Sequence, residues 1–266
     1  MSYETIKFEI KDNVAEVTLN RPDALNAMNH LMLAELKDVV RQIHLKLVEA
    51  RALLITGEGR GFCSGADLMD SVRQASAGPV ERDSGSMLMD KYHPLFLDIA
   101  ALDIPVITAV NGIAAGAGMS LSISADFVCA ARSASFLQAF INIGLVPDAG
   151  STWLLPRLIG PARAKRMMML GEKIPAETAF DWGLCHSLSD DDTLMDDARA
   201  LAQKLANGPT LAHGKIRSLI RTTFDASYAE QIQNEALAQR SANQSADAVE
   251  GVTAFVQKRP AAFKGH

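Results

Sequence analysis

Residues 109–126 (AVNGIAAGAGMSLSISAD) constrain the fold more than any other stretch of the chain. The stretch begins as a buried strand, passes through Gly116, Ala117 and Gly118, and continues as an apolar helix. A glycine-containing turn between a strand and a helix lets another molecule approach the backbone closely. The first N–H groups of such a helix lack partners inside it and attract negative charge. The turn therefore predicts a site for a phosphate, or for a carbonyl oxygen that becomes an oxyanion during a reaction.

The rest of the chain alternates short strands with helices and ends in a block of helices. Alternating residues predict a hairpin of strands at 3–10 and 14–19, and continuous apolar runs predict buried strands at 52–56, 106–110 and 127–131. A glycine-rich loop is expected at 57–64 and a mobile insertion at 71–86. The expected helices are 30–49, 87–101, 152–158, 161–170, 175–182, 190–206, 209–223, 228–240 and 243–257. This order predicts the α/β class with covered sheets.

A second stretch, FCSGAD at 62–67, has the same form as the first turn, because it places Gly65 at the start of a short helix. If the two helix starts converge, two backbone N–H groups can bind one oxygen and form an oxyanion hole. The alternative is that both are tight turns needed only for packing a helix on a strand. Spacing alone does not decide between these interpretations.

Charge and composition limit the partners. The net charge is −5 and the pI about 5.7, which argues against nucleic acid as a partner. No apolar run approaches the ~18 residues of a membrane span. The three cysteines, Cys63, Cys129 and Cys185, are not spaced for a metal site, and their odd number favours a reducing compartment. The first residues have no apolar core of a signal peptide, so we expect a cytoplasmic protein.

Several motifs together resemble the enoyl-CoA hydratase/isomerase family, also called the crotonase family. They are LNRP at 19–22 with LNA at 25–27, FCSGADL at 62–68, IPVITAVNGIAAGAG at 104–118, residues 144–150 with LPR at 155–157, and FVQKRPAAF at 255–263. The resemblance covers nearly the whole chain. It implies a spiral core of repeated ββα units at residues 1–200 and a helical region at 201–266 that forms homotrimers or dimers of trimers.

The resemblance also implies an acyl-CoA thioester as substrate, with no cofactor and no metal. The N–H groups of Ala66 and Ala117 would hold the thioester oxygen while an enolate forms. The residues implied to contact the coenzyme A part are Arg21, Ala24, Ala27, Ser64, Asp67 and Leu68, with Lys258 and Phe263 contributed by the same or a neighbouring subunit. Those implied around the acyl group are His93, Gly116, Ser120, Phe140 and Trp153.

The sequence departs from the hydratases of this family at two positions. A hydratase uses two carboxylates to position water and move protons, whereas the corresponding positions here are Ser120 and Phe140. One acid remains at a suitable place, Asp148 in the segment LVPDAG. It resembles the acid/base of the family's phenylacetate-pathway isomerases, and burial would raise its pKa toward neutrality. The alternative is that Asp148 caps the helix expected near Ser151.

Other functions use the same residues. In the family's 4-chlorobenzoyl-CoA dehalogenases an Asp at this position attacks the ring and a His near the position of His93 activates water, but their pattern has Trp where this chain has Phe140. A hydratase with a relocated acid and a non-catalytic acyl-CoA-binding protein also remain open. We therefore expect an acyl-CoA enzyme of fatty or aromatic acid degradation, with double-bond isomerisation by Asp148 as the leading hypothesis.

Overall fold

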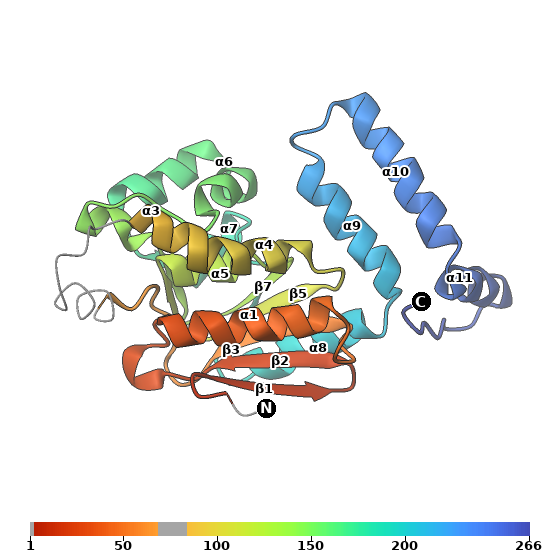
Figure 1. Cartoon of the computed structure of the whole chain (residues 1–266), viewed down its shortest axis with the longest axis horizontal. Coiled ribbons are helices and arrows are strands. Elements are labelled where there is room, and N and C mark those ends of the chain that lie inside the picture. Colours follow the sequence, from red (N-terminus) through yellow and green to blue (C-terminus); the bar gives the residue numbers. More distant parts are fainter. Residues whose placement is uncertain (1–2, 69–83) are drawn as a thin grey trace.

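Two β-sheets form the centre of the molecule (Figure 1). The structure is a computed structural model, and it describes residues 3–68 and 84–266. The larger sheet has the strand order β1 (Ile6–Lys11), β2 (Val14–Leu19), β3 (Ala52–Gly57), β5 (Val106–Val110), β7 (Phe127–Ala131) and β10 (Ser187–Ser189). Its β1–β2 pair is antiparallel and the other pairs are parallel. The smaller sheet has the order β4 (Gly61–Cys63), β6 (Ile113–Ala115), β8 (Ser135–Leu137) and β9 (Ile174–Pro175).

The two sheets are built by a repeated unit. In each of the pairs β3–β4, β5–β6 and β7–β8, the first strand joins the larger sheet and the second joins the smaller one, and helical segments follow. The parallel pairings β4–β6 and β6–β8 stack the second strands of successive units. The chain therefore climbs as a spiral of ββα units, which confirms the expected α/β spiral core.

Helices surround the sheets, and each begins or ends where its sequence requires. They are α1 (His30–His44), α3 (Ser84–Met87), α4 (His93–Ala101), α5 (Ala117–Ile123), α6 (Ser151–Leu170), α7 (Ala176–Asp181), α8 (Leu194–Ala206), α9 (Thr210–Thr222), α10 (Tyr228–Asn243) and α11 (Ala246–Gln257). Shorter helical turns are η1 (Pro22–Ala24), η2 (Leu88–Tyr92) and η3 (Ala139–Ile143). Helix α8 packs on the larger sheet through Leu194, Ala198, Ala202 and Ala206, whose spacing of four places them on one face. None of the described helices is long and apolar enough to cross a membrane.

Two details differ from the pattern expected from sequence. Helix α1 ends at His44 rather than residue 49, because Lys46 takes a left-handed conformation with φ +54° that no helix continues. The expected loop at 57–64 contains β4, which has three residues and is too short to show a periodicity. The two helices expected at 152–158 and 161–170 are confirmed, because α6 breaks at Gly160 (φ +77°), whose backbone is not helical and which precedes Pro161. The insertion expected at 71–86 lies mostly outside the described residues.

The C-terminal helices α9, α10 and α11 lie beside the sheets as a separate group, on the right of Figure 1. Arg217 of α9 attaches this group to the core, because its guanidinium pairs with Asp126 at 2.6 Å and donates to the carbonyls of Leu102 and Ile99. The boundary expected at residue 200 falls inside α8, which packs on the sheet. The helices that extend from the core therefore begin at Thr210.

Candidate active site

The two glycine turns meet. Gly65 follows β4 and Gly116 follows β6, and these strands are parallel neighbours, so both turns lie at the same edge of the smaller sheet. A Cβ atom on Gly65 would lie 2.9 Å from the carbonyl oxygen of Ala115 and 3.4 Å from the nitrogen of Ala117. Both glycines have positive φ, +103° and +51°. The close approach and the backbone conformation each exclude a side chain here.

Two backbone donors remain unused at this junction. Helix α5 begins at Ala117, whose N–H has no partner within the helix. On the other turn, Met28 donates to the carbonyl of Gly65 at 2.7 Å and Asp67 donates to Met28 at 3.0 Å, which leaves the N–H of Ala66 between them. Within residues 3–68 and 84–266, neither N–H donates to a backbone oxygen. Two such donors beside one another can stabilise negative charge on a single oxygen.

Asp148 lies just before α6, but its side chain does not cap that helix. The N-cap residue is Gly150, and no side-chain hydrogen bond is present at this cap. The Asp148 Oδ1 atom is buried and has no hydrogen-bond partner. Burial of the carboxyl raises the pKa of Asp148 from 3.8 to about 6. A carboxyl group with this pKa can both accept and return a proton near neutral pH.

The main chain at Asp148 is held from two sides. Its carbonyl oxygen accepts hydrogen bonds from the Ser120 hydroxyl at 3.1 Å, the Ser151 hydroxyl at 2.9 Å and the Ser151 N–H at 3.1 Å. Ala149 and Gly150 follow with positive φ, +50° and +82°. A positive φ is unfavourable for alanine, so the backbone of this turn is strained, and the hydrogen bonds to the Asp148 carbonyl help to hold it in this conformation.

Ser120, which the sequence suggests as a substrate contact, is fully buried, and its hydroxyl forms hydrogen bonds with backbone carbonyls. Besides the carbonyl of Asp148, it lies 3.3 Å from the carbonyl of Gly116. Gln138, which sequence reasoning did not single out, is also fully buried, and its Oε1 atom has no partner. A glutamine between a strand and a helical turn carries no sequence signal that distinguishes it from a surface residue.

The aromatic residues expected around the acyl group lie on both sides of the turns. Phe140 covers Gly116, because a Cβ atom on that glycine would lie 3.7 Å from Cζ of the ring. Trp153 and His93 line a cavity of about 410 Å³ that also contacts Ala149, next to Asp148. Trp153 is 36% exposed, and the Arg157 guanidinium lies over its ring at 3.9 Å. The cavity is also lined by Arg221 of α9, a residue that the sequence did not single out.

Most residues expected to contact coenzyme A lie together. Arg21 pairs with Asp67 at 2.8 Å and donates to the carbonyl of Ala27 at 2.5 Å. The hydroxyl of Ser64 donates to the carbonyl of Ala24 at 3.2 Å. Leu68, the last described residue before the gap, is exposed next to Asp67. The segment 21–27 and the segment 64–68 therefore form one surface.

Lys258 and Phe263 do not join this surface within one copy of the chain. The Phe263 ring packs against Gly251 of α11, and its carbonyl accepts from Arg51 at 3.2 Å. In Figure 1, α11 and the C-terminus lie on the right, whereas the red-orange segment around η1 lies on the left. Within one copy of the chain, Lys258 and Phe263 therefore lie apart from the surface around Arg21.

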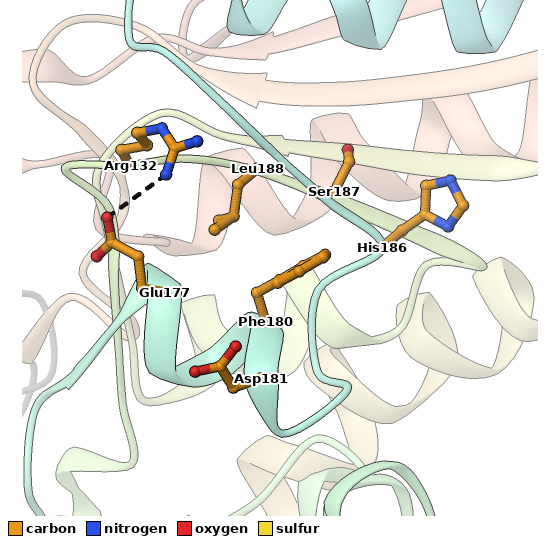
Figure 2. A pocket seen from close by; sticks show the side chains of 7 residues that line it. All are labelled: Arg132, Glu177, Phe180, Asp181, His186, Ser187 and Leu188. Atoms are coloured by element: carbon orange, nitrogen blue, oxygen red, sulfur yellow. Dashed lines mark ion pairs between the residues drawn. The ribbon is translucent and has the colours of Figure 1, made fainter.

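Two other cavities differ in what they contain. A small one is lined by Ala66 and Asp67, beside one of the glycine turns. Figure 2 shows another, of about 550 Å³, between α7 and β10, where the ion pair Arg132–Glu177 measures 3.7 Å and Phe180 and His186 both line the wall. It contains no residue of the two glycine turns. In the part of the chain that the structure describes, no group of three or more His, Cys, Asp or Glu side chains is arranged to hold a metal ion.

Comparison with known proteins agrees with the fold and identifies the family. The family model described as enoyl-CoA hydratase/isomerase matches residues 9–266. The chain is 44% identical to 1,2-epoxyphenylacetyl-CoA isomerase of Escherichia coli K12 over 98% of its own length and 99% of that protein, and 43% identical over the full length of both chains to a Rhodobacter capsulatus protein named "Probable enoyl-CoA hydratase". The crystal structure of enoyl-CoA hydratase from Bacillus anthracis superposes with a TM-score of 0.91 at 30% identity, covering 99% of this chain and 100% of that one. The chain is an enzyme of the enoyl-CoA hydratase/isomerase family.

Proposed function

We propose that this enzyme isomerises the double bond of an enoyl-CoA, with Asp148 as its acid/base. The observation that carries the proposal is the half-buried Asp148 carboxyl, whose pKa is raised to about 6 and whose Oδ1 atom has no hydrogen-bond partner among the described residues. Residues 120 and 140 are serine and phenylalanine, so they supply no carboxylate for adding water. The relative named 1,2-epoxyphenylacetyl-CoA isomerase supports isomerisation over hydration.

The proposed reaction needs no group from outside the chain. The Asp148 carboxylate removes a proton from the α-carbon of a β,γ-unsaturated thioester, and the electron pair moves to the thioester oxygen as a dienolate forms. The N–H groups of Ala66 and Ala117 stabilise the negative charge on that oxygen. The protonated Asp148 then returns the proton to the γ-carbon, the carbonyl re-forms, and the product is the conjugated α,β-unsaturated thioester.

The absorbance of a conjugated enoyl thioester tests the reaction directly. Wild type and Asp148→Asn are each supplied with a β,γ-unsaturated CoA thioester, and both are also monitored for exchange of α-protons in heavy water. We expect isomerisation and exchange in wild type and a loss of roughly 10²–10⁴-fold in the variant, the usual contribution of general acid–base catalysis. Asp190→Asn, a change in the acidic run far from the turns, is the matched control and keeps the wild-type rate. Equal rates in wild type and Asp148→Asn would refute the assignment.

We also propose that copies of the chain assemble, as trimers or dimers of trimers, so that Lys258 and Phe263 of one copy approach the coenzyme A surface of another. Helix α11 supports this assembly, because Val249, Val252, Phe255 and Val256 lie along one face and are all strongly exposed; Phe255 is 85% exposed. An apolar stripe of this kind favours a protein partner. Light scattering should give an oligomer for wild type and a smaller species for Phe255→Asp. A monomeric wild type would contradict the proposal.

A further inference from the structure

We infer that Ser120 is a positioning residue for Asp148: its hydroxyl ties the turn that carries the acid to the helix whose first N–H faces the thioester oxygen. The inference rests on the proposed function and adds a residue to it. The contact of Ser120 with the substrate stays a prediction; within the protein, its hydroxyl connects two separate segments through the carbonyl of Asp148.

The placement of Ser120 gives it this role. It lies three residues after Ala117 in α5, so both residues occupy the same side of the helix. Its hydroxyl is 3.1 Å from the carbonyl oxygen of Asp148 and 3.3 Å from that of Gly116. The carbonyl of Gly116 already accepts the N–H of Ser120 at 3.1 Å, and a hydroxyl has one proton to donate. The bond to Asp148 is therefore the one that connects separate segments.

The orientation of the Asp148 carboxylate depends on how the main chain of Asp148 is held. In the described part of the chain, no hydrogen bond is found to the Asp148 carboxylate, so no side-chain partner fixes its orientation. The carbonyl of the same residue, in contrast, accepts donors from Ser120 of α5 and Ser151 of α6. Ser151 belongs to the segment that follows Asp148 and moves with it. Ser120 is therefore the donor that fixes the position of the Asp148 turn relative to helix α5, which carries the N–H group of Ala117.

This arrangement matters because proton transfer depends steeply on distance. A displacement of about 1 Å of a reacting group lowers a rate roughly 10²-fold. Removal of the Ser120 hydroxyl, in contrast, deletes a single hydrogen bond, which is a small part of what stabilises the fold. Loss of the Ser120 hydroxyl is therefore expected to reduce turnover far more than it reduces folding.

Helix α5 offers a matched control. Ser122 is also fully buried, but its hydroxyl donates to the carbonyl of Met119 at 2.8 Å and does not contact the Asp148 turn. We expect Ser120→Ala to lower kcat about 10–100-fold with KM changed less than about 3-fold, whereas Ser122→Ala stays within about 3-fold of wild type in both. Ser120→Thr, which keeps the hydroxyl, should recover most of the loss in kcat.

A double-mutant cycle separates positioning from general packing. If Ser120 acts through the Asp148 carboxylate, Ser120→Ala has no further effect on α-proton exchange once Asp148→Asn is present. Equal losses in both backgrounds, or a Ser120→Ala enzyme with normal kcat, would overturn the inference while leaving Asp148 as the acid.

A second measurement does not depend on activity. The pKa of Asp148 is read by ¹³C NMR of its labelled carboxyl in wild type, Ser120→Ala and Ser122→Ala. We expect a lower pKa in Ser120→Ala, because a released turn exposes the carboxyl to water, and an unchanged pKa in Ser122→Ala. An unchanged pKa in Ser120→Ala would contradict the positioning role. If Asp148→Asn keeps full activity, the proposed function fails, and this titration alone still decides whether Ser120 positions the carboxyl.

Discussion

Asp148 should make the folded enzyme less stable as the pH rises, and Asp148→Asn should remove this effect. The pKa of Asp148 is about 6 in the folded protein and 3.8 is its ordinary value, so between these pH values the folded state binds more protons than the unfolded state. Stability then falls as the pH rises through this range. At about 1.36 kcal/mol per pH unit, the full difference corresponds to about 3 kcal/mol. Because the carboxyl is partly open to solvent, we expect about 1–2 kcal/mol.

The assay is urea unfolding of wild type and Asp148→Asn at one protein concentration. We expect the variant to be more stable than wild type by about 1–2 kcal/mol at pH 8, by less at pH 5, and not at all below pH 3.8. Glu250 provides a control of opposite sign, because its bonds from Arg259 and the Ala262 N–H lower its pKa to about 2. Its stabilisation is present above pH 4.5 and is lost as the pH falls toward 2, so Glu250→Gln destabilises at pH 8. An Asp148→Asn enzyme that is less stable than wild type at pH 8 would refute the reasoning.

Three further results are expected. The kcat/KM for isomerisation should rise with pH through about 6, as Asp148 loses its proton, and Asp148→Asn should lack this limb in a pH–rate profile. Gly65→Ala should lower kcat by at least about 10²-fold, because the added Cβ would lie 2.9 Å from the Ala115 carbonyl and would displace the neighbouring N–H; a wild-type rate in steady-state kinetics contradicts this. Arg217→Ala should destabilise the fold by about 1–2 kcal/mol in urea unfolding, because it removes the ion pair with Asp126 and the bonds to the carbonyls of Leu102 and Ile99, whereas exposed Arg221→Ala should cost less than about 1 kcal/mol.

The sequence predicted those helices and strands whose apolar residues follow a regular pattern or whose ends are marked by a proline or glycine. Strands β3, β5 and β7 of the larger sheet are continuous apolar runs, and the interruption of α6 follows from Pro161, so both could be placed from residue types. The smaller sheet could not, because β4, β6 and β8 have three residues each and their neighbours come from distant segments. The end of α1 was placed too late because Leu47 continued the apolar spacing after the backbone had turned.

The residue types of the candidate site could be picked out from the sequence, but the contacts between these residues could not. The two glycine turns stand out in sequence because few other residues tolerate positive φ. The role of Ser120 was not predictable, because a serine in a helix forms bonds that only the neighbouring turn decides, and that turn lies 28 residues away. Lys258 and Phe263 were placed at the site from resemblance, and a single chain keeps them apart from it.

The pairing of β4 with β6 sets the distance between the two glycine turns. Neighbouring strands in a sheet are held about 4.8 Å apart by their hydrogen bonds, whatever their side chains are. Gly65 and Gly116 lie just after these adjacent strands, so the backbone ladder holds the two turns side by side, and with them the N–H groups of Ala66 and Ala117. An oxygen seated between two donors about this far apart can lie within hydrogen-bond distance of both. Because main-chain bonds set the spacing of the two turns, nearby side chains such as Phe140 and Trp153 can be replaced without changing it.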